Sequence, residues 1–326
     1  MLKPVLENLI RRENLSAEES GSALTAMIHG ADPHQAAAFL ALMEAKGVTA
    51  HELAGMARAM RAAAVRVHAD YPLLDTCGTG GDGAGTVNIS TGAAILAAAC
   101  GIKVAKHGNR AVSGKCGSAD VLQTLGVKID LPPDGVQACL DQAGIAFLFA
   151  PTYHPAMKEL APVRKGLGVR TVVNLLGPLC NPADVQYQLM GVFSAHLLPI
   201  IAETLFELGV KRALIAHGQG LDELTTSGKS KGVLIQNGAM ENITIDPSDF
   251  GFARCILSDL QGGDADTNAR LLRESLQGKP GPVADTLALN AGYCNFLYGL
   301  CATPADGVRL AQTRLADGTA KKTLQT

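Results

Sequence analysis

The sequence predicts an α/β fold in which a helical N-terminal part precedes a mostly parallel sheet flanked by helices. Three observations support this prediction. Apolar residues recur at helical spacing through residues 1–68, where no strand pattern occurs. From residue 73 onward, short apolar runs alternate with helical segments, as is typical of parallel sheets. Two glycine-rich loops each follow a predicted strand, and parallel sheets gather such loops at one edge.

The N-terminal part is predicted to form four helices. Ser16 and Thr49 each begin a capping box, with a glutamate three residues later. Asp32 is a predicted cap followed by proline at the first helical position. This helical layer carries no obvious catalytic group, so packing or a subunit interface is its expected role.

Six strands are predicted beyond the helical part. They cover residues 73–75, 102–106, 145–149, 189–193, 212–216 and 233–236. Helices are expected near residues 90–100, 118–125, 134–143 and 197–208, and again after about residue 266. The segment 155–182 breaks this alternation with two predicted helices. We expect it to return to the helical layer, which would leave a cleft between two lobes.

The composition indicates a globular protein without a membrane segment. Hydrophobic residues make up 47% of the 326 residues and charged residues 18%. A net charge of −2 gives no support for a nucleic-acid or membrane surface. No apolar run approaches the roughly 18 residues that a membrane span needs. The first residues lack a signal core, so a cytoplasmic protein is expected.

The stretch 75–91 lies between a predicted strand and a predicted helix. It contains the glycines Gly78, Gly80, Gly81, Gly83 and Gly85. A backbone without Cβ atoms can approach a ligand closely and turn its N–H groups inward. The N-terminus of the following helix adds a partial positive charge. We therefore expect this stretch to bind a phosphate.

Two familiar phosphate motifs do not fit this stretch. Gly78, Gly80 and Gly83 match the dinucleotide fingerprint, but that fingerprint also needs an acid about 20 residues further on. No Asp or Glu occurs between Asp82 and Asp120. The Gly-Lys-Ser/Thr of a P-loop is absent as well. A merely flexible loop is the plain alternative, and the polar residues at the helix start disfavour it.

A second loop, residues 106–118, also suits an anion. It gathers Lys106, Arg110 and Lys115 with backbone amides and another helix start, for which Ser118 is the predicted N-cap. Two such loops at one sheet edge predict a ligand with two separated phosphate groups.

The adjacent acids Asp222 and Glu223 follow another predicted strand. Such pairs are usually solvated, but beside a polyphosphate they suit Mg²⁺, which favours one or two carboxylates plus phosphate oxygens and water. The Ser90 hydroxyl is a further candidate ligand. Zinc is disfavoured because histidine and cysteine form no zinc-like cluster in the sequence.

Five segments closely resemble the signatures of the anthranilate phosphoribosyltransferase family. They are residues 75–91, 106–109, 117–120, 169–182 and 220–225. The succession of Gly-Thr-Gly-Gly-Asp-Gly, Asn-Ile-Ser-Thr and Lys-His-Gly-Asn-Arg is highly specific, and the resemblance covers nearly the whole chain. It implies transfer of the phosphoribosyl group of phosphoribosyl pyrophosphate (PRPP) to anthranilate, in tryptophan biosynthesis.

The resemblance also implies the organisation of the chain. It predicts a small helical lobe hinged to a larger lobe with a mostly parallel sheet flanked by helices. The helical lobe would cover residues 1–70, joined by about 155–185. The α/β lobe would cover residues 71–154 and 186–326. Relatives usually dimerise through the helical lobe, so a homodimer is expected, without a nucleic-acid or membrane partner.

The resemblance implies a set of residues for each ligand. PRPP would be bound by Gly78, Thr79, Gly80, Gly81, Asp82, Thr86, Asn88, Ile89, Ser90, Thr91, Lys106, His107, Gly108, Asn109, Arg110, Ala111, Val112, Ser113, Gly114 and Ser118. Anthranilate would contact Gly78, His107, Asn109 and Arg164, and two Mg²⁺ ions would engage Ser90, Asp222 and Glu223. Arg164 suits the substrate carboxylate because its planar guanidinium can donate two hydrogen bonds. His154 is interpreted as a structural histidine.

Two alternatives remain open. A pyrimidine-nucleoside phosphorylase of the same fold would use inorganic phosphate and should not need the acids at 222–223. A nucleic-acid-binding paralogue should lack the anthranilate residues and carry a basic face. The presence of Asn109 and Arg164, together with the net charge of −2, favours the transferase.

Overall fold

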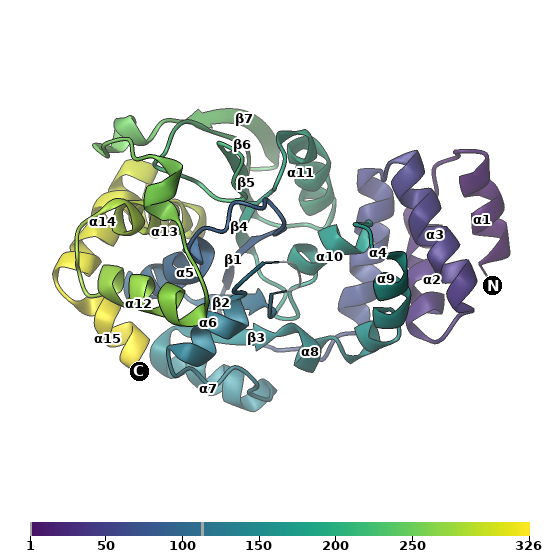
Figure 1. The fold of residues 1–326 in the computed structure, drawn as a ribbon, viewed down its shortest axis with the longest axis horizontal. Coiled ribbons are helices and arrows are strands. Elements are labelled where there is room, and N and C mark those ends of the chain that lie inside the picture. Colours follow the sequence, from purple (N-terminus) through teal and green to yellow (C-terminus); the bar gives the residue numbers. More distant parts are fainter. Residues whose placement is uncertain (1, 112–113) are drawn as a thin grey trace.

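The computed structural model describes residues 2–111 and 114–326, with an N-terminal helical bundle beside a larger α/β unit (Figure 1). The bundle contains α1 (Lys3–Ile10), α2 (Ala17–Ile28), α3 (Pro33–Lys46) and α4 (Ala50–Ala62). Both predicted capping boxes are confirmed, at Ser16 and Thr49. Asp32 caps α3 as predicted, by accepting hydrogen bonds from the backbone N–H groups of His34 and Gln35.

A seven-stranded sheet in the order β3-β2-β1-β4-β5-β6-β7 forms the centre of the larger unit. Its strands are β1 (Leu74–Gly78), β2 (Val104–Gly108), β3 (Ile145–Phe149), β4 (Tyr187–Gly191), β5 (Arg212–Gly218), β6 (Ser230–Gln236) and β7 (Ala239–Ile245). Adjacent strands in the series β3-β2-β1-β4-β5 pair in parallel. Strand β6 pairs antiparallel with both β5 and β7. The predicted fold class is confirmed.

Two local predictions differ from the structure. The sequence prediction omits β7, a sheet-edge strand whose side chains are mostly exposed. The dipeptide Asn237-Gly238 before β7 is the sequence signal for a two-residue hairpin turn and therefore for a following strand. In the structure both residues have positive φ, 52° and 72°, as such a turn requires. The predicted N-cap Ser118 is wrong by one residue, because Gly117 caps α6 and its N–H donates to the Asp120 carboxylate at 2.9 Å.

Helices cover both faces of the sheet. One face carries α5 (Ile89–Ala99), α6 (Ser118–Thr124), α12 (Ala265–Leu276), α13 (Pro282–Tyr298), α14 (Pro304–Ala316) and α15 (Thr319–Gln325). The other carries α7 (Pro133–Ala143), α10 (Val173–Leu179) and α11 (Leu198–Glu207). Leu189 and Leu214 join the first core, whereas Met190 and Ile215 join the second, as the alternation of side chains along a strand requires. No helix in the described part of the chain combines the length and apolar character needed to cross a membrane.

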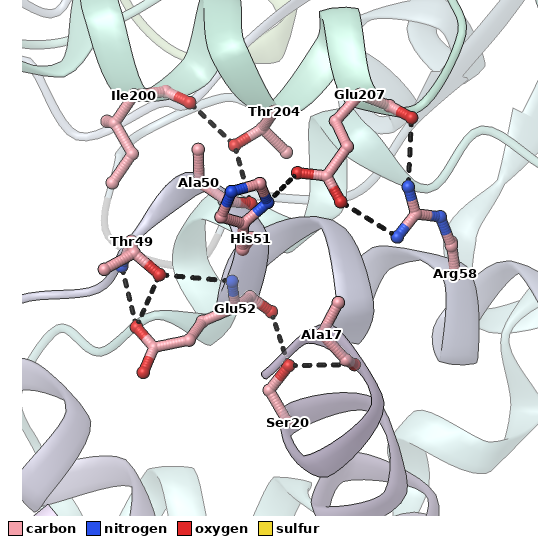
Figure 2. Close-up of polar contacts among 10 residues, drawn as sticks. All are labelled: Ala17, Ser20, Thr49, Ala50, His51, Glu52, Arg58, Ile200, Thr204 and Glu207. Carbon is pink, nitrogen blue, oxygen red and sulfur yellow. Dashed lines mark hydrogen bonds and ion pairs between the residues drawn. The ribbon is translucent and has the colours of Figure 1, made fainter. Parts of the chain in front are cut away.

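The bundle meets the α/β unit at two places. After α8 (Ala150–Tyr153), the chain runs through α9 (Ala161–Leu167), which packs on α3, and then α10, which packs on α4 and β2. The second junction joins α4 to α11. There His51 and Arg58 both contact the carboxylate of Glu207 (Figure 2), with Arg58 Nη1 3.1 Å from Glu207 Oε1.

The segment that contains Asp222 crosses over the ends of β1 and β4 at the carboxyl edge of the sheet, and two glycines leave room for it. Gly78 and Gly191 are paired at the ends of β1 and β4, and the Asp222 segment lies against both. A Cβ atom on Gly191 would lie 1.5 Å from the Asp222 carbonyl oxygen, and a Cβ atom on Gly78 would lie 2.2 Å from Asp222 Oδ2. Only glycine leaves room for this crossing.

We expect Gly191→Ala to lower the free energy of unfolding by about 1–3 kcal/mol or more, because backbone atoms of the Asp222 segment must shift to admit the methyl group. Gly166→Ala is the matched control, since a Cβ atom there meets nothing within 4 Å. In α9 this control should be neutral or stabilising by up to about 1 kcal/mol. Urea unfolding followed by circular dichroism measures both variants. Wild-type stability for Gly191→Ala would contradict the crossing.

Candidate active site

Three loops meet at the carboxyl edge of the parallel strands. Residues 79–88 connect β1 to α5, residues 109–117 connect β2 to α6, and residues 219–229 follow β5. Because β1 pairs with β2 on one side and β4 on the other, the first loop lies between the other two. The prediction that the two glycine-rich loops share a sheet edge is confirmed.

The first loop depends on glycine for its shape. Gly80, Gly81, Gly83 and Gly85 all have positive φ, between 63° and 79°, which other residues rarely adopt. The Thr79 N–H donates to Gly191 O at 3.0 Å, which fixes the start of the loop on β4. Within the loop, the Ala84 N–H donates to Asp82 Oδ1 at 3.1 Å.

The far end of this loop is held by residues from both neighbouring segments. Asn88 Nδ2 donates to Cys116 O at 3.1 Å, which ties the first loop to the second. Thr86 pairs with Gln261 in an isolated bridge. Ile89 and Thr91 are buried, and their backbone N–H groups donate to Val87 O at 2.7 Å and to Asn88 O at 3.1 Å. Asn88 is the N-cap residue of α5, but its side chain makes no capping hydrogen bond.

Asp222 and Glu223 point at the first loop and the start of α5. Asp222 Oδ2 accepts a hydrogen bond from the Gly80 N–H at 2.6 Å, and Glu223 Oε1 accepts one from the Ser90 N–H at 3.1 Å. Asn290 of α13 anchors the segment, because its Nδ2 donates to Leu224 O at 2.8 Å. The two carboxylates therefore accept hydrogen bonds from the same backbone N–H groups that a phosphate would use.

The electrostatics of this pair favour a cation. Burial raises the pKa of Asp222 to about 7, and the nearby Asp82 adds to the effect. Burial raises the pKa of Glu223 well above its usual range, and Asp222 contributes further. Within residues 2–111 and 114–326, no three His, Cys, Asp or Glu side chains are grouped to bind a metal ion. A hard cation here would therefore need further oxygen ligands, such as the Ser90 hydroxyl and ligand oxygens.

A buried lysine supplies positive charge beneath the loops. Lys106 Nζ donates to Thr76 O at 2.6 Å and to Ser90 Oγ at 3.3 Å, so it joins β2 to β1 and α5. Asp75 is buried next to it, and this burial raises the pKa of Asp75 to about 6, although Lys106 opposes the shift. Asp75 Oδ2 accepts a hydrogen bond from Asn181 Nδ2 at 2.8 Å.

The second loop is braced by α6. Arg110 Nη1 donates to Asp120 Oδ1 at 2.9 Å, so this predicted phosphate ligand already has an anionic partner. The Ala111 N–H donates to Asp120 Oδ2 at 3.0 Å. Ser118 Oγ donates to Asn109 O at 3.3 Å and lies against Gly108, where a Cβ atom would come within 2.2 Å of it.

Three further residues of this loop were predicted as ligands. Gly114 is exposed. Val112 and Ser113 lie outside the described residues.

His107 and His154 form a buried pair beneath these loops. Their ring centroids are 5.1 Å apart, and His107 Nδ1 lies 3.2 Å from Gly177 O. Burial lowers the pKa of His107 to about 3 and also lowers that of His154. His107 Nε2 and both ring nitrogens of His154 have no hydrogen-bond partner in the described structure, which is unusual for buried polar atoms. The sequence holds no local signal for this pairing of His107 with His154, because the fold brings together two residues that are 47 positions apart.

Arg164, another predicted site residue, does not lie at the sheet edge. It belongs to α9, which packs on the helical bundle. Its side chain is half-buried, and desolvation lowers its pKa. None of the ion pairs in the described residues includes Arg164. A half-buried guanidinium without an acidic partner is suited to an anionic ligand.

Comparisons with known proteins agree with this geometry. The family described as "Glycosyl transferase family, a/b domain" matches residues 70–321, and "Glycosyl transferase family, helical bundle domain" matches residues 3–64. The anthranilate phosphoribosyltransferase of Chlamydia felis is 45% identical over 326 residues, covering 100% of this chain and 95% of the relative. That of Rubrobacter xylanophilus is 46% identical over 328 residues, covering 100% and 96%.

Solved structures give the same result. Anthranilate phosphoribosyltransferase from Thermus thermophilus has a TM-score of 0.93 and 44% identity, covering 98% of this chain and 97% of that one. The enzyme from Saccharomyces cerevisiae in complex with PRPP and Mg has a TM-score of 0.91 and 28% identity, covering 99% and 96%. The chain belongs to the anthranilate phosphoribosyltransferase family.

Proposed function

We propose that this protein transfers the phosphoribosyl group of PRPP to the amine of anthranilate, in tryptophan biosynthesis. The products are N-(5-phosphoribosyl)anthranilate and pyrophosphate. The observation that carries the proposal is the meeting of a glycine-rich loop, a buried lysine and a buried acid pair at one sheet edge. The family membership supports the same reaction, since full-length relatives at 45–46% identity are anthranilate phosphoribosyltransferases.

PRPP would bind across both loops. Its proposed ligands are residues 78–82, Thr86, residues 88–91, residues 106–114 and Ser118. Backbone N–H groups of the first loop would contribute most, because the glycines of this loop carry no side chain. A pyrophosphate group is a natural ligand for such N–H groups beside a helix N-terminus.

The acid pair fits Mg²⁺. The side chains of Asp222, Glu223 and Ser90 offer only oxygen atoms as ligands, and a cation would offset the burial and the neighbouring negative charge that raise both carboxyl pKa values. We propose two Mg²⁺ ions, held by these residues together with pyrophosphate oxygens. Bound Mg²⁺ would stabilise negative charge on the departing pyrophosphate. The N–H groups of Gly80 and Ser90, which donate to Asp222 and Glu223 here, would be available to phosphate oxygens if these carboxylates bound cations instead.

The chemistry needs no protein nucleophile. Departure of pyrophosphate from a carbon beside the ring oxygen favours an oxocarbenium-like transition state. The protein then has to stabilise the departing charge and hold a weak aromatic amine in line with the ribose carbon. Lys106 supplies fixed positive charge beneath the loops, because its ammonium is buried and hydrogen-bonded to both β1 and α5.

Anthranilate would lie between α9 and the carboxyl end of β2. Arg164 would bind its carboxylate, and this anion would offset the cost of the half-buried guanidinium. Asn109, His107 and the backbone at Gly78 would complete the site. His107 stays neutral at physiological pH, because burial lowers its pKa to about 3, so it serves as a positioning group without charge.

The wider organisation is also a proposal. We assign residues 1–70 with about 155–185 to a helical lobe, and residues 71–154 with 186–326 to the PRPP-binding lobe. The packing of α9 on α3 and of α10 on α4 supports this division. A homodimer through the helical lobe and a cytoplasmic location complete the proposal. Ile10 of α1, which is 67% exposed, is a candidate interface residue.

We expect anthranilate fluorescence to fall when the protein is mixed with anthranilate, PRPP and Mg²⁺, and to remain constant when EDTA replaces Mg²⁺. The physical reason is that the carboxylates of Asp222 and Glu223 repel the pyrophosphate group unless a cation lies between the carboxylates and the pyrophosphate. Product pyrophosphate should appear in step with the fluorescence loss. No consumption of either substrate by folded protein would contradict the proposed function.

We expect Arg164→Ala to raise the KM for anthranilate at least about tenfold, the effect of losing a hydrogen bond from a charged group, and to change the KM for PRPP little. The exposed neighbour Lys165 offers a matched control, and Lys165→Ala should behave like the wild type. Steady-state kinetics with each substrate varied separately measure this. An equal loss for both substrates would contradict the role of Arg164.

A further inference from the structure

Arg170 contacts the glycine-rich loop between β1 and α5. It lies in the connection between α9 and α10, just after Gly168, which ends α9 in the left-handed conformation. Its Nη2 donates a hydrogen bond to Gly81 O, at the tip of the loop between β1 and α5. The two residues are 89 positions apart in the sequence, so only the fold brings them together.

The same guanidinium has a second contact with this region. Arg170 Cζ lies over the ring of Phe193, 4.7 Å from the ring centroid, within the range of a cation–π interaction. The backbone N–H of Phe193 in turn donates to Thr79 Oγ1 at 3.0 Å. Arg170 therefore holds the loop directly at Gly81 and indirectly through Thr79.

The loop is shaped to receive this side chain. Gly81 has φ of 79°, and a Cβ atom there would lie 2.4 Å from Arg170 Nη2. None of the ion pairs among residues 2–111 and 114–326 includes Arg170, so no carboxylate competes for its guanidinium. An exposed arginine fixed by a carbonyl oxygen and an aromatic ring, and by no acid, is placed for geometry more than for charge.

We propose that Arg170 is a positioning residue that fixes residues 79–85 in the conformation that receives the pyrophosphate of PRPP. This inference rests on the proposed function. Arg164 and Arg170 flank the end of the same short helix, and that helix packs on the bundle. Arg170 thus connects the segment after the helix that would bind anthranilate to the loop that would bind PRPP.

The first test is calorimetric titration of PRPP, with Mg²⁺ and without anthranilate, into the full-length protein and Arg170→Ala. The expected result is a Kd at least about tenfold weaker for the variant, because a hydrogen bond from a charged group is lost. Arg170→Lys should recover only part of the affinity, since an ammonium keeps the charge but lacks the planar guanidinium that lies over Phe193. Arg273→Ala, on an exposed face of α12, is the control and should bind as the wild type does.

The second test is hydrogen–deuterium exchange of the unliganded proteins. Peptides covering residues 79–86 should exchange faster in Arg170→Ala, while peptides covering residues 104–108 of β2 exchange as in the wild type. Unchanged Kd and unchanged exchange would overturn the proposal, and so would full rescue by Arg170→Lys, which would show that charge alone suffices. If the wild-type protein itself fails to bind PRPP with Mg²⁺, the proposed function fails instead, so the two failures are distinguishable.

Discussion

The close crossing of the Asp222 segment over the ends of β1 and β4 is the constraint on which the rest of the site depends. Gly191 and Gly78 leave no room for a side chain, so the segment can lie directly against the sheet edge. This brings Asp222 and Glu223 within hydrogen-bond distance of Gly80 and Ser90. Phosphate donors and candidate metal ligands thereby share one small volume, which is what transfer from a pyrophosphate substrate requires.

The arrangement is electrostatically costly in the free protein. Two neighbouring buried carboxyl groups, with Asp82 close by, disfavour ionisation, and their raised pKa values express that cost. Backbone N–H groups and Lys106 offset part of it. Strain of this kind is typical of functional sites, where stability is given up for a ligand-ready geometry. A cation with pyrophosphate would relieve it, whereas inorganic phosphate alone would add further negative charge. The geometry thus favours a PRPP transferase over a phosphorylase.

Much of the fold could be predicted from sequence, because it depends on local signals. Capping boxes predict the helices of the bundle, and alternating apolar runs predict six of the seven strands. The positions of the two glycine-rich loops after predicted strands indicate that both loops lie at one edge of the sheet. β7 was missed because its exposed side chains give no apolar pattern, although its Asn-Gly turn was available. The burial of Asp222 and the juxtaposition of His107 with His154 depend on tertiary packing. The contact of Arg170 with Gly81 likewise has no local signature, since adjacent acids, single histidines and surface arginines are usually unremarkable in sequence.

Calorimetric binding of PRPP in the presence of Mg²⁺ to the double variant Asp222→Asn/Glu223→Gln tests the central claim most directly. The amide side chains keep the size of the acids and can still accept hydrogen bonds from Gly80 and Ser90, so the variant should fold. With the buried charges removed, it should unfold at a temperature equal to or above that of the wild type. Binding should be at least about tenfold weaker, whereas the exposed control Asp266→Asn should bind normally. Wild-type affinity in the double variant would contradict the account.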